Sequence, residues 1–148
     1  MKSEPETYSI DQLKKDKVTS WEGVRNYQAR NFMMKDMQVG DDVIFYHSNA
    51  TPPGIAGLAK VSSKAHPDPT ALNKKSEYFE KRATPENPVW HCVDVKFQKK
   101  FSRLIPLQEL KENKALAEML LLRKGSRLSI TPVSEAHYKE ILKIAEEP

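Results

Sequence analysis

Val43-Ile44-Phe45-Tyr46-His47 is the most strand-like run of this 148-residue chain. Its residues are β-branched or aromatic, which favours extended backbone on a pleated surface. Successive side chains of a strand point to opposite faces of a sheet, and here both faces are apolar until His47. The run therefore predicts a central strand that is covered on both sides and carries polar side chains only at its end.

Further strands and short helices are predicted outward from this run. Residues 55–61 form a partner strand, in which Gly57 indicates the close approach of another backbone or a ligand. Strands are also predicted over residues 89–97 and 127–133. Capping and periodicity signals predict short helices after Ser9, over residues 28–37, after Pro106 and after Ser134. Because the strands do not alternate with long helices, the pattern predicts an α+β fold: a small, mostly antiparallel sheet or open barrel with helices around it.

Composition and charge restrict the class of protein. The length suits one domain, and no repeat or linker divides residues 1–148. No apolar run exceeds four residues, the length of Met119–Leu122, which is far too short to cross a membrane. A single cysteine and a polar N-terminus predict an intracellular protein in a reducing compartment. The formal net charge of +4 and the pI of about 9.1 permit nucleic-acid binding without requiring it.

Motifs for catalysis and metal binding are missing from the sequence. The five glycines form neither a phosphate loop nor a dinucleotide motif, and HExxH, CxxC and GxSxG are absent. No two of the four histidines have metal-ligand spacing. His91 and Cys92 are strand neighbours that point to opposite faces and so form no catalytic pair; Cys92 is expected to be a small, partly buried hydrophobe. We predict no catalytic residue, no metal and no cofactor.

Three stretches are richer in hydrogen-bonding and aromatic side chains than a scaffold needs: residues 2–5, 20–30 and 45–49. In the second, Trp21 could stack on a base and Asn26 could bond a base edge, while Arg25 and Arg30 could pair with phosphates. The alternative is that Trp21 belongs to the core and that Asn26 caps the following helix. Residues 2–5 could equally be a frayed terminus, and His47 a structural residue. The basic run over residues 96–103 is either a solvated strand and turn or a phosphate contact.

These stretches resemble the EVE domain family, in order from Lys2 to about Leu142. The resemblance rests on Lys2-Ser3-Glu4-Pro5, residues 21–31, Phe45-Tyr46-His47-Ser48-Asn49, residues 53–57, Pro67-Asp68, Trp90 with Val93-Asp94-Val95, and residues 127–132. It implies a PUA-like fold, a small and strongly bent, mostly antiparallel β-barrel with flanking short helices. Family members usually carry apolar residues before the Lys-Ser-Glu-Pro motif; here Met1 stands directly before it, so the first strand is expected to be short.

The resemblance also implies a function. The related YTH domains hold N6-methyladenine in an aromatic cage, and EVE domains are thought to read modified bases, notably modified cytosines in DNA. By this analogy the chain is a non-catalytic, monomeric module that binds DNA or RNA containing a modified base. Its expected binding residues are Lys2, Ser3, Glu4, Trp21, Arg25, Asn26, Tyr27, His47 and Ser48, with Arg127, Ser129 and Pro132 closing the other side of the pocket.

Two other functions remain open from the sequence. Glu4 and His47, with Lys2, could form an acid–base group of a hydrolase or nuclease. The same pocket could also serve as a sensor for a small molecule or nucleoside. Because bacterial members are often lone domains of this length, we expect a cytoplasmic bacterial protein, or a nuclear one if the source is eukaryotic.

Overall fold

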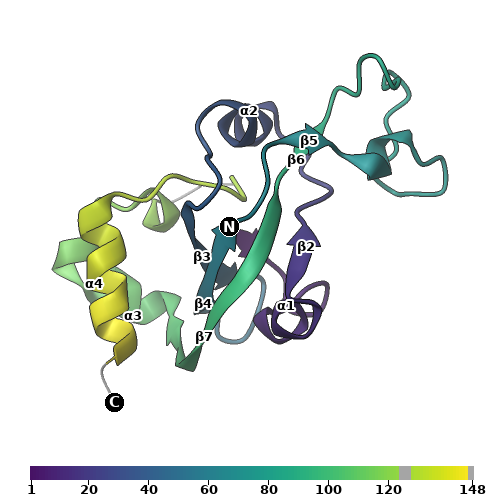
Figure 1. The fold of residues 1–148 in the computed structure, drawn as a ribbon. Coiled ribbons are helices and arrows are strands. Elements are labelled where there is room, and N and C mark those ends of the chain that lie inside the picture. Colours follow the sequence, from purple (N-terminus) through teal and green to yellow (C-terminus); the bar gives the residue numbers. More distant parts are fainter. Residues whose placement is uncertain (124–127, 147–148) are drawn as a thin grey trace.

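A computed structural model describes residues 1–123 and 128–146 and shows a curled sheet with helices on both sides (Figure 1). The sheet order is β1 (Lys2–Ser3), β3 (Asp42–His47), β4 (Gly54–Val61), β7 (Asp94–Pro106) and β2 (Val18–Ser20). Only the pairing of β1 with β3 is parallel among the described strands. A small second sheet pairs β5 (His66–Pro67) with β6 (His91–Cys92). The predicted bent, mostly antiparallel α+β fold is confirmed.

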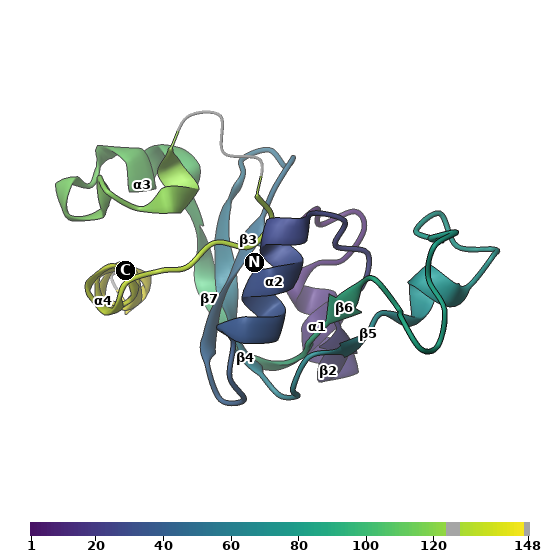
Figure 2. The same cartoon turned by 90° about the horizontal axis from the view of Figure 1, so that it is seen from above.

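Short helices cover the two faces of the sheet (Figure 2). They are α1 (Ile10–Asp16), α2 (Tyr27–Lys35), α3 (Leu107–Glu112) and α4 (Glu135–Glu146), with 3-10 turns at Pro69–Leu72, Lys114–Leu116 and Leu120–Leu122. The predicted caps are present: the side chains of Ser9 and Ser134 accept hydrogen bonds from the backbone of Gln12 and His137. These caps satisfy N–H groups that have no partner within the helix.

The central strand β3 is buried on both sides, as predicted. Val43 and Phe45 join the hydrophobic cluster under α1 and α2, while Ile44 and Tyr46 join the cluster under α3 and α4. Gly57 on the neighbouring β4 confirms the expected close approach, because a Cβ atom at this position would collide with the carbonyl oxygen of Lys99. The two clusters give the curled sheet a core on each face.

Two predicted strands differ from the structure. The strand expected over residues 89–97 begins later and runs on to Pro106, because Val89 has a positive φ of 64° and the basic run continues to pair with β4. The described part of residues 127–133 is irregular, and its backbone carbonyl at Ser129 accepts one hydrogen bond, from Lys2 N at 2.8 Å. Pro132 has no N–H to donate to a ladder. Arg127 lies outside the described residues.

Residues 68–90 form a segment that projects beyond β5 and β6 in both views (Figures 1 and 2). A hydrogen bond from Asp68 N to Trp90 O, at 2.9 Å, closes its neck. The sequence predicts a long polar segment that runs over the surface here. In the structure, the ion pair between Asp68 and Arg25 joins this projecting segment to the loop before α2.

Candidate functional site

A pocket of about 480 Å³ lies where the curl of the sheet brings its two edge strands together. Its lining comes from residues 2–4 at β1, from Thr7 and Tyr8 in the following turn, and from residues 19–25 at the end of β2. Tyr78 of the projecting segment and Ser129 complete it. Segments that are distant in sequence therefore build one concave site, the usual setting for a ligand.

The pocket gathers about half of the predicted binding residues. Those that line it are Lys2, Ser3, Glu4, Trp21, Arg25 and Ser129. Those placed outside it are Asn26, Tyr27, His47, Ser48 and Pro132. Tyr8, Glu22 and Tyr78 also line the pocket and were not among the predicted site residues. Tyr78 had no local signal, because only the folding-back of the projecting segment brings it to the pocket.

Three aromatic side chains line the pocket. Trp21 is 9% exposed and meets Phe45 edge-on, with ring centroids 5.5 Å apart, so it is at once a core residue and part of the lining. Tyr8 is anchored by the hydrogen bond that its hydroxyl donates to Asp16 Oδ2, at 2.8 Å. Tyr78 is 37% exposed and lies against Gly23. The arrangement offers aromatic surface to a flat ligand.

Gly23 is the residue that allows Tyr78 to close this wall. A Cβ atom at this position would lie 2.8 Å from the Tyr78 ring, and the backbone has a φ of +84°, which side chains rarely adopt. Both the space and the backbone angle therefore require glycine.

Polar groups in the pocket carry both signs of charge. Lys2 is half-buried, burial lowers its pKa, and its ammonium group makes no ion pair among the described residues. Burial, and then the charge of nearby Asp68, raises the pKa of the Glu22 carboxyl. Ser3 Oγ donates to Tyr8 O at 2.6 Å, which fixes the turn after β1. An unpaired, partly desolvated cation is well suited to an anionic or strongly hydrogen-bond-accepting ligand.

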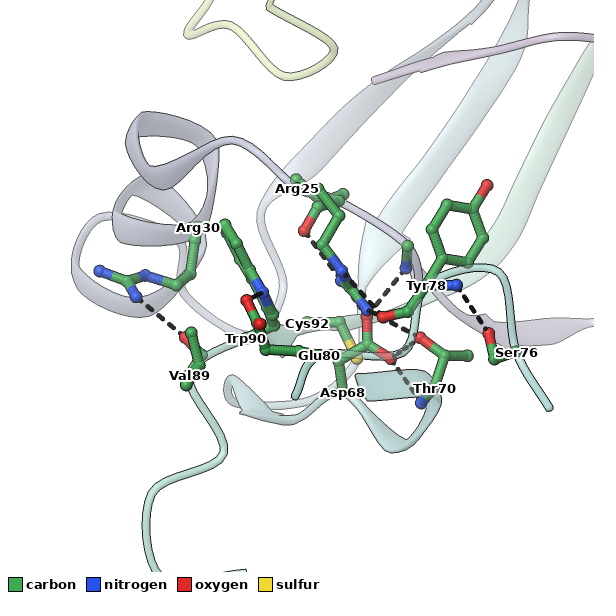
Figure 3. Close-up of polar contacts among 12 residues, drawn as sticks. Arg25, Arg30, Asp68, Thr70, Ser76, Tyr78, Glu80, Val89, Trp90 and Cys92 are labelled. Atoms are coloured by element: carbon green, nitrogen blue, oxygen red, sulfur yellow. Dashed lines mark hydrogen bonds and ion pairs between the residues drawn. The ribbon is translucent and has the colours of Figure 1, made fainter. Parts of the chain in front are cut away.

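Arg25 acts within the protein (Figure 3). All five of its N–H donors have partners: Nε and Nη2 bond the carbonyl of Tyr78, Nη2 also bonds Thr70 Oγ1, and Nη1 bonds Val24 O and Asp68 Oδ2. The phosphate contact expected from sequence has no donor left in this arrangement. Arg25 instead holds the Tyr78 wall in place.

Asp68 is the fully buried centre of this network. Its carboxylate accepts hydrogen bonds from Gly23 N, Arg25 Nη1, and both the backbone and the hydroxyl of Thr70. Burial by itself would raise the pKa of Asp68, but these hydrogen bonds outweigh it and lower the pKa. A charged Asp68 therefore ties the projecting segment to the pocket loop.

The residues after Arg25 are also used internally. The side chain of Asn26 accepts from Ala29 N at 3.0 Å and caps α2, as the structural alternative predicted. Tyr27 stacks on Trp90, with centroids 4.7 Å apart and planes at 22°. Arg30 lies over Tyr27 and donates to Val89 O at 2.9 Å. These residues fasten the neck of the projecting segment to α2.

His47 and Glu4 do not come together as an acid–base pair. His47 Nε2 accepts a hydrogen bond from Ile10 N at 3.1 Å, and burial lowers its pKa, so the ring is a neutral structural acceptor. Glu4 lies at the pocket and is contacted by the Asn49 amide at 3.5 Å. Ser48 pairs through its backbone with Ser3 O. The geometry gives the hydrolase alternative no support.

The rest of the described chain offers few other sites. A second pocket of about 420 Å³ is more apolar and lies between α2, β3 and the start of α4; Pro132 lines it. Within residues 1–123 and 128–146, no three His, Cys, Asp or Glu side chains are grouped so that they could hold a metal ion. In the same ranges, no helix is long and apolar enough to span a membrane. Cys92, which was expected to be partly buried, is fully buried.

Comparisons with known proteins agree with this architecture. The family model described as the EVE domain matches residues 1–144. Human thymocyte nuclear protein 1 is 41% identical over 165 residues, which cover 99% of this chain and 72% of the human protein. A crystal structure of a Pseudomonas putida protein is 45% identical, with a TM-score of 0.94 over 98% of this chain and 97% of that one. Human THYN1 has been solved in complex with DNA containing 5-methylcytosine; it is 39% identical, with a TM-score of 0.92 over 100% of this chain and 96% of that one.

Proposed function

Because the chain belongs to the EVE domain family, we propose that it binds DNA containing a modified cytosine and holds the modified base in the pocket between β1 and β2. The human relative with the same fold has been solved with DNA that contains 5-methylcytosine. The proposed activity is recognition without chemistry, since Glu4 and His47 form no catalytic pair. DNA is favoured over RNA because it is the nucleic acid in that complex.

One observation carries the proposal: the pocket combines three aromatic side chains with an unpaired lysine. Trp21, Tyr8 and Tyr78 line it, and Lys2 brings the free ammonium group. Extruding a base from a duplex costs a few kcal/mol, and stacking on an aromatic side chain returns roughly 1–3 kcal/mol. The ammonium group of Lys2 adds attraction for the phosphates that flank the extruded base.

The methyl group accounts for the preference. A methyl carbon that becomes buried contributes about 0.8 kcal/mol, which corresponds to roughly a four-fold difference in affinity. Trp21 supplies a wall for that contact because it is rigid, being packed edge-on against Phe45. We therefore expect a preference of a few-fold for the methylated base, on top of general affinity for DNA.

The experiment measures fluorescence anisotropy with two duplexes of one sequence, which differ only in one 5-methylcytosine. The wild-type protein should bind the methylated duplex about four-fold more tightly. Trp21→Phe keeps an aromatic core residue but removes part of the wall, so it should lower this preference. Lys2→Met should weaken binding to both duplexes equally and reduce the salt slope by about one. Lys111→Met, on α3 away from the pocket, is the matched control and should change neither.

Equal wild-type affinity for the two duplexes would overturn the proposal. So would an effect of Lys2→Met no larger than that of Lys111→Met. Free 5-methylcytidine and a methylated RNA of the same sequence serve as competitors. If the free nucleoside competes as well as the duplex, the pocket is a nucleoside sensor instead.

A further inference from the structure

Phe79 is an exposed aromatic residue beside the pocket that the proposed base contact does not use. It is 36% exposed, belongs to neither hydrophobic cluster, and makes no ring contact among the described residues. Its chain neighbour Tyr78 lines the pocket. The two aromatic residues therefore stand side by side on the projecting segment, one at the pocket and one outside it.

The backbone that presents Phe79 is held firmly. The Tyr78 carbonyl accepts two hydrogen bonds from Arg25, at 2.7 and 3.3 Å (Figure 3). Phe79 N donates to Ser76 O at 3.2 Å. Glu80 N donates to Ala71 O at 2.9 Å. This preorganisation means that little conformational entropy is lost when the segment binds a partner.

The charges around Phe79 favour a polyanion as that partner, because residues 74–82 hold four bases against two acids, Glu77 and Glu80. Lys74, Lys75 and Lys81 are exposed and form no ion pair among the described residues. Arg82 and Glu80 neutralise each other in an ion pair of 2.8 Å. In such an arrangement the exposed lysines can contact the phosphates of a nucleic acid while the aromatic ring contacts its bases.

We propose that Phe79 is a wedge that enters the base stack of duplex DNA beside the extruded base. Tyr78 lines the pocket that would hold the extruded base, and the next residue, Phe79, is exposed and available to the base step beside it. Apolar side chains that unstack base steps in this way are common among DNA-bending proteins. The inference rests on the proposed function, because it needs a base to leave the stack.

The test compares a duplex with a single strand, since a single strand has no stack of paired bases to open. Phe79→Ala should lower affinity for a 5-methylcytosine duplex at least ten-fold and leave affinity for the methylated single strand within two-fold. Phe79→Leu, which keeps an apolar wedge, should retain most of the duplex affinity. Val39→Ala removes a similarly exposed apolar side chain elsewhere and should change neither affinity. A 2-aminopurine placed beside the methylated base should brighten with the wild-type protein and not with Phe79→Ala.

Two results would overturn the wedge. Phe79→Ala could leave duplex binding unchanged, in which case the exposed ring serves another partner, such as a protein. It could instead weaken duplex and single strand equally, in which case Phe79 supports the pocket itself. If the wild-type protein does not distinguish methylated from plain DNA but Phe79→Ala still loses duplex affinity alone, the wedge stands and the modified-base proposal fails.

Discussion

Replacing Asp68 by asparagine removes the charge at the centre of the network that holds the pocket wall. The change keeps the size of the side chain, so it creates no cavity. One carboxylate oxygen, Oδ1, serves Thr70, and the amide oxygen of asparagine can take over this role. The other, Oδ2, accepts from Gly23 N at 2.8 Å and Arg25 Nη1 at 3.0 Å. An NH₂ group in place of Oδ2 is itself a donor, so it could accept neither of these two hydrogen bonds.

The expected cost follows from these two bonds. A hydrogen bond to a charged group contributes about 1.5–3 kcal/mol, and breaking one side of a buried ion pair costs about 3–5 kcal/mol. The Arg25 side chain is 22% exposed, so water can replace part of what it loses. We therefore expect Asp68→Asn to lower the free energy of unfolding by about 3 kcal/mol and Tm by about 10 °C for a chain of this length.

Urea denaturation monitored by tryptophan fluorescence measures this change, and Asp36→Asn is the control. Asp36 is exposed, and its side chain makes no hydrogen bond among the described residues, so its replacement should cost less than 0.5 kcal/mol or so. The pKa of Asp68 is lowered in the folded protein, so its contribution is present above the ordinary value of 3.8 and is lost as the pH falls below it. The difference in free energy of unfolding between wild type and Asp68→Asn should therefore become smaller below about pH 4. A loss under 1 kcal/mol at pH 7 would refute the reasoning.

Two further predictions concern the sheet and the histidines. Gly57→Ala should lower the free energy of unfolding by about 1–3 kcal/mol or more, because its Cβ atom would meet the Lys99 carbonyl; an unchanged urea midpoint would contradict the close packing of β4 and β7. In an NMR titration, burial should make His47 titrate below 6.5. Burial also disfavours the charged form of His66, but the hydrogen bond to Asp94 at 2.8 Å outweighs it, so His66 should titrate above 6.5. The reverse order of the two histidines would show that these contacts are absent in solution.

The elements with strong local signals were predictable from the sequence. The apolar run of β3, the Ser9 and Ser134 caps and the close approach at Gly57 each follow from residue type and spacing alone. The end of β7 was missed because its basic residues resemble a turn, whereas pairing with β4 continues through them. Irregular backbone at residues 128–134 was missed for the opposite reason: β-branched residues suggest a strand, but Pro132 and a single bond to Lys2 do not sustain one.

The site was predictable only in part, because residue type does not tell whether a side chain binds a ligand or another part of the protein. Residues 2–4 and Trp21 could be found from a motif, and the structure brings them together. Arg25 carries the right charge for a phosphate, yet its guanidinium group is paired with Asp68, a buried aspartate 43 residues away. Tyr78 could not be found, since its position depends on Gly23 and on the same distant ion pair.

The contact between the short strand β1 and Ser129 determines when the pocket can be completed during synthesis. Lys2 leaves the ribosome 127 residues before Ser129, whose carbonyl oxygen accepts a hydrogen bond from the Lys2 backbone N–H. Closing so long a loop carries an entropic cost that the earlier contacts of β3, β4 and β7 must already offset. A nascent chain can thus pair β3, β4 and β7 before its pocket is complete. Binding of the ligand would therefore report that the segments around Lys2 and Ser129 have met, and a chain that stops before Ser129 would lack part of the pocket lining.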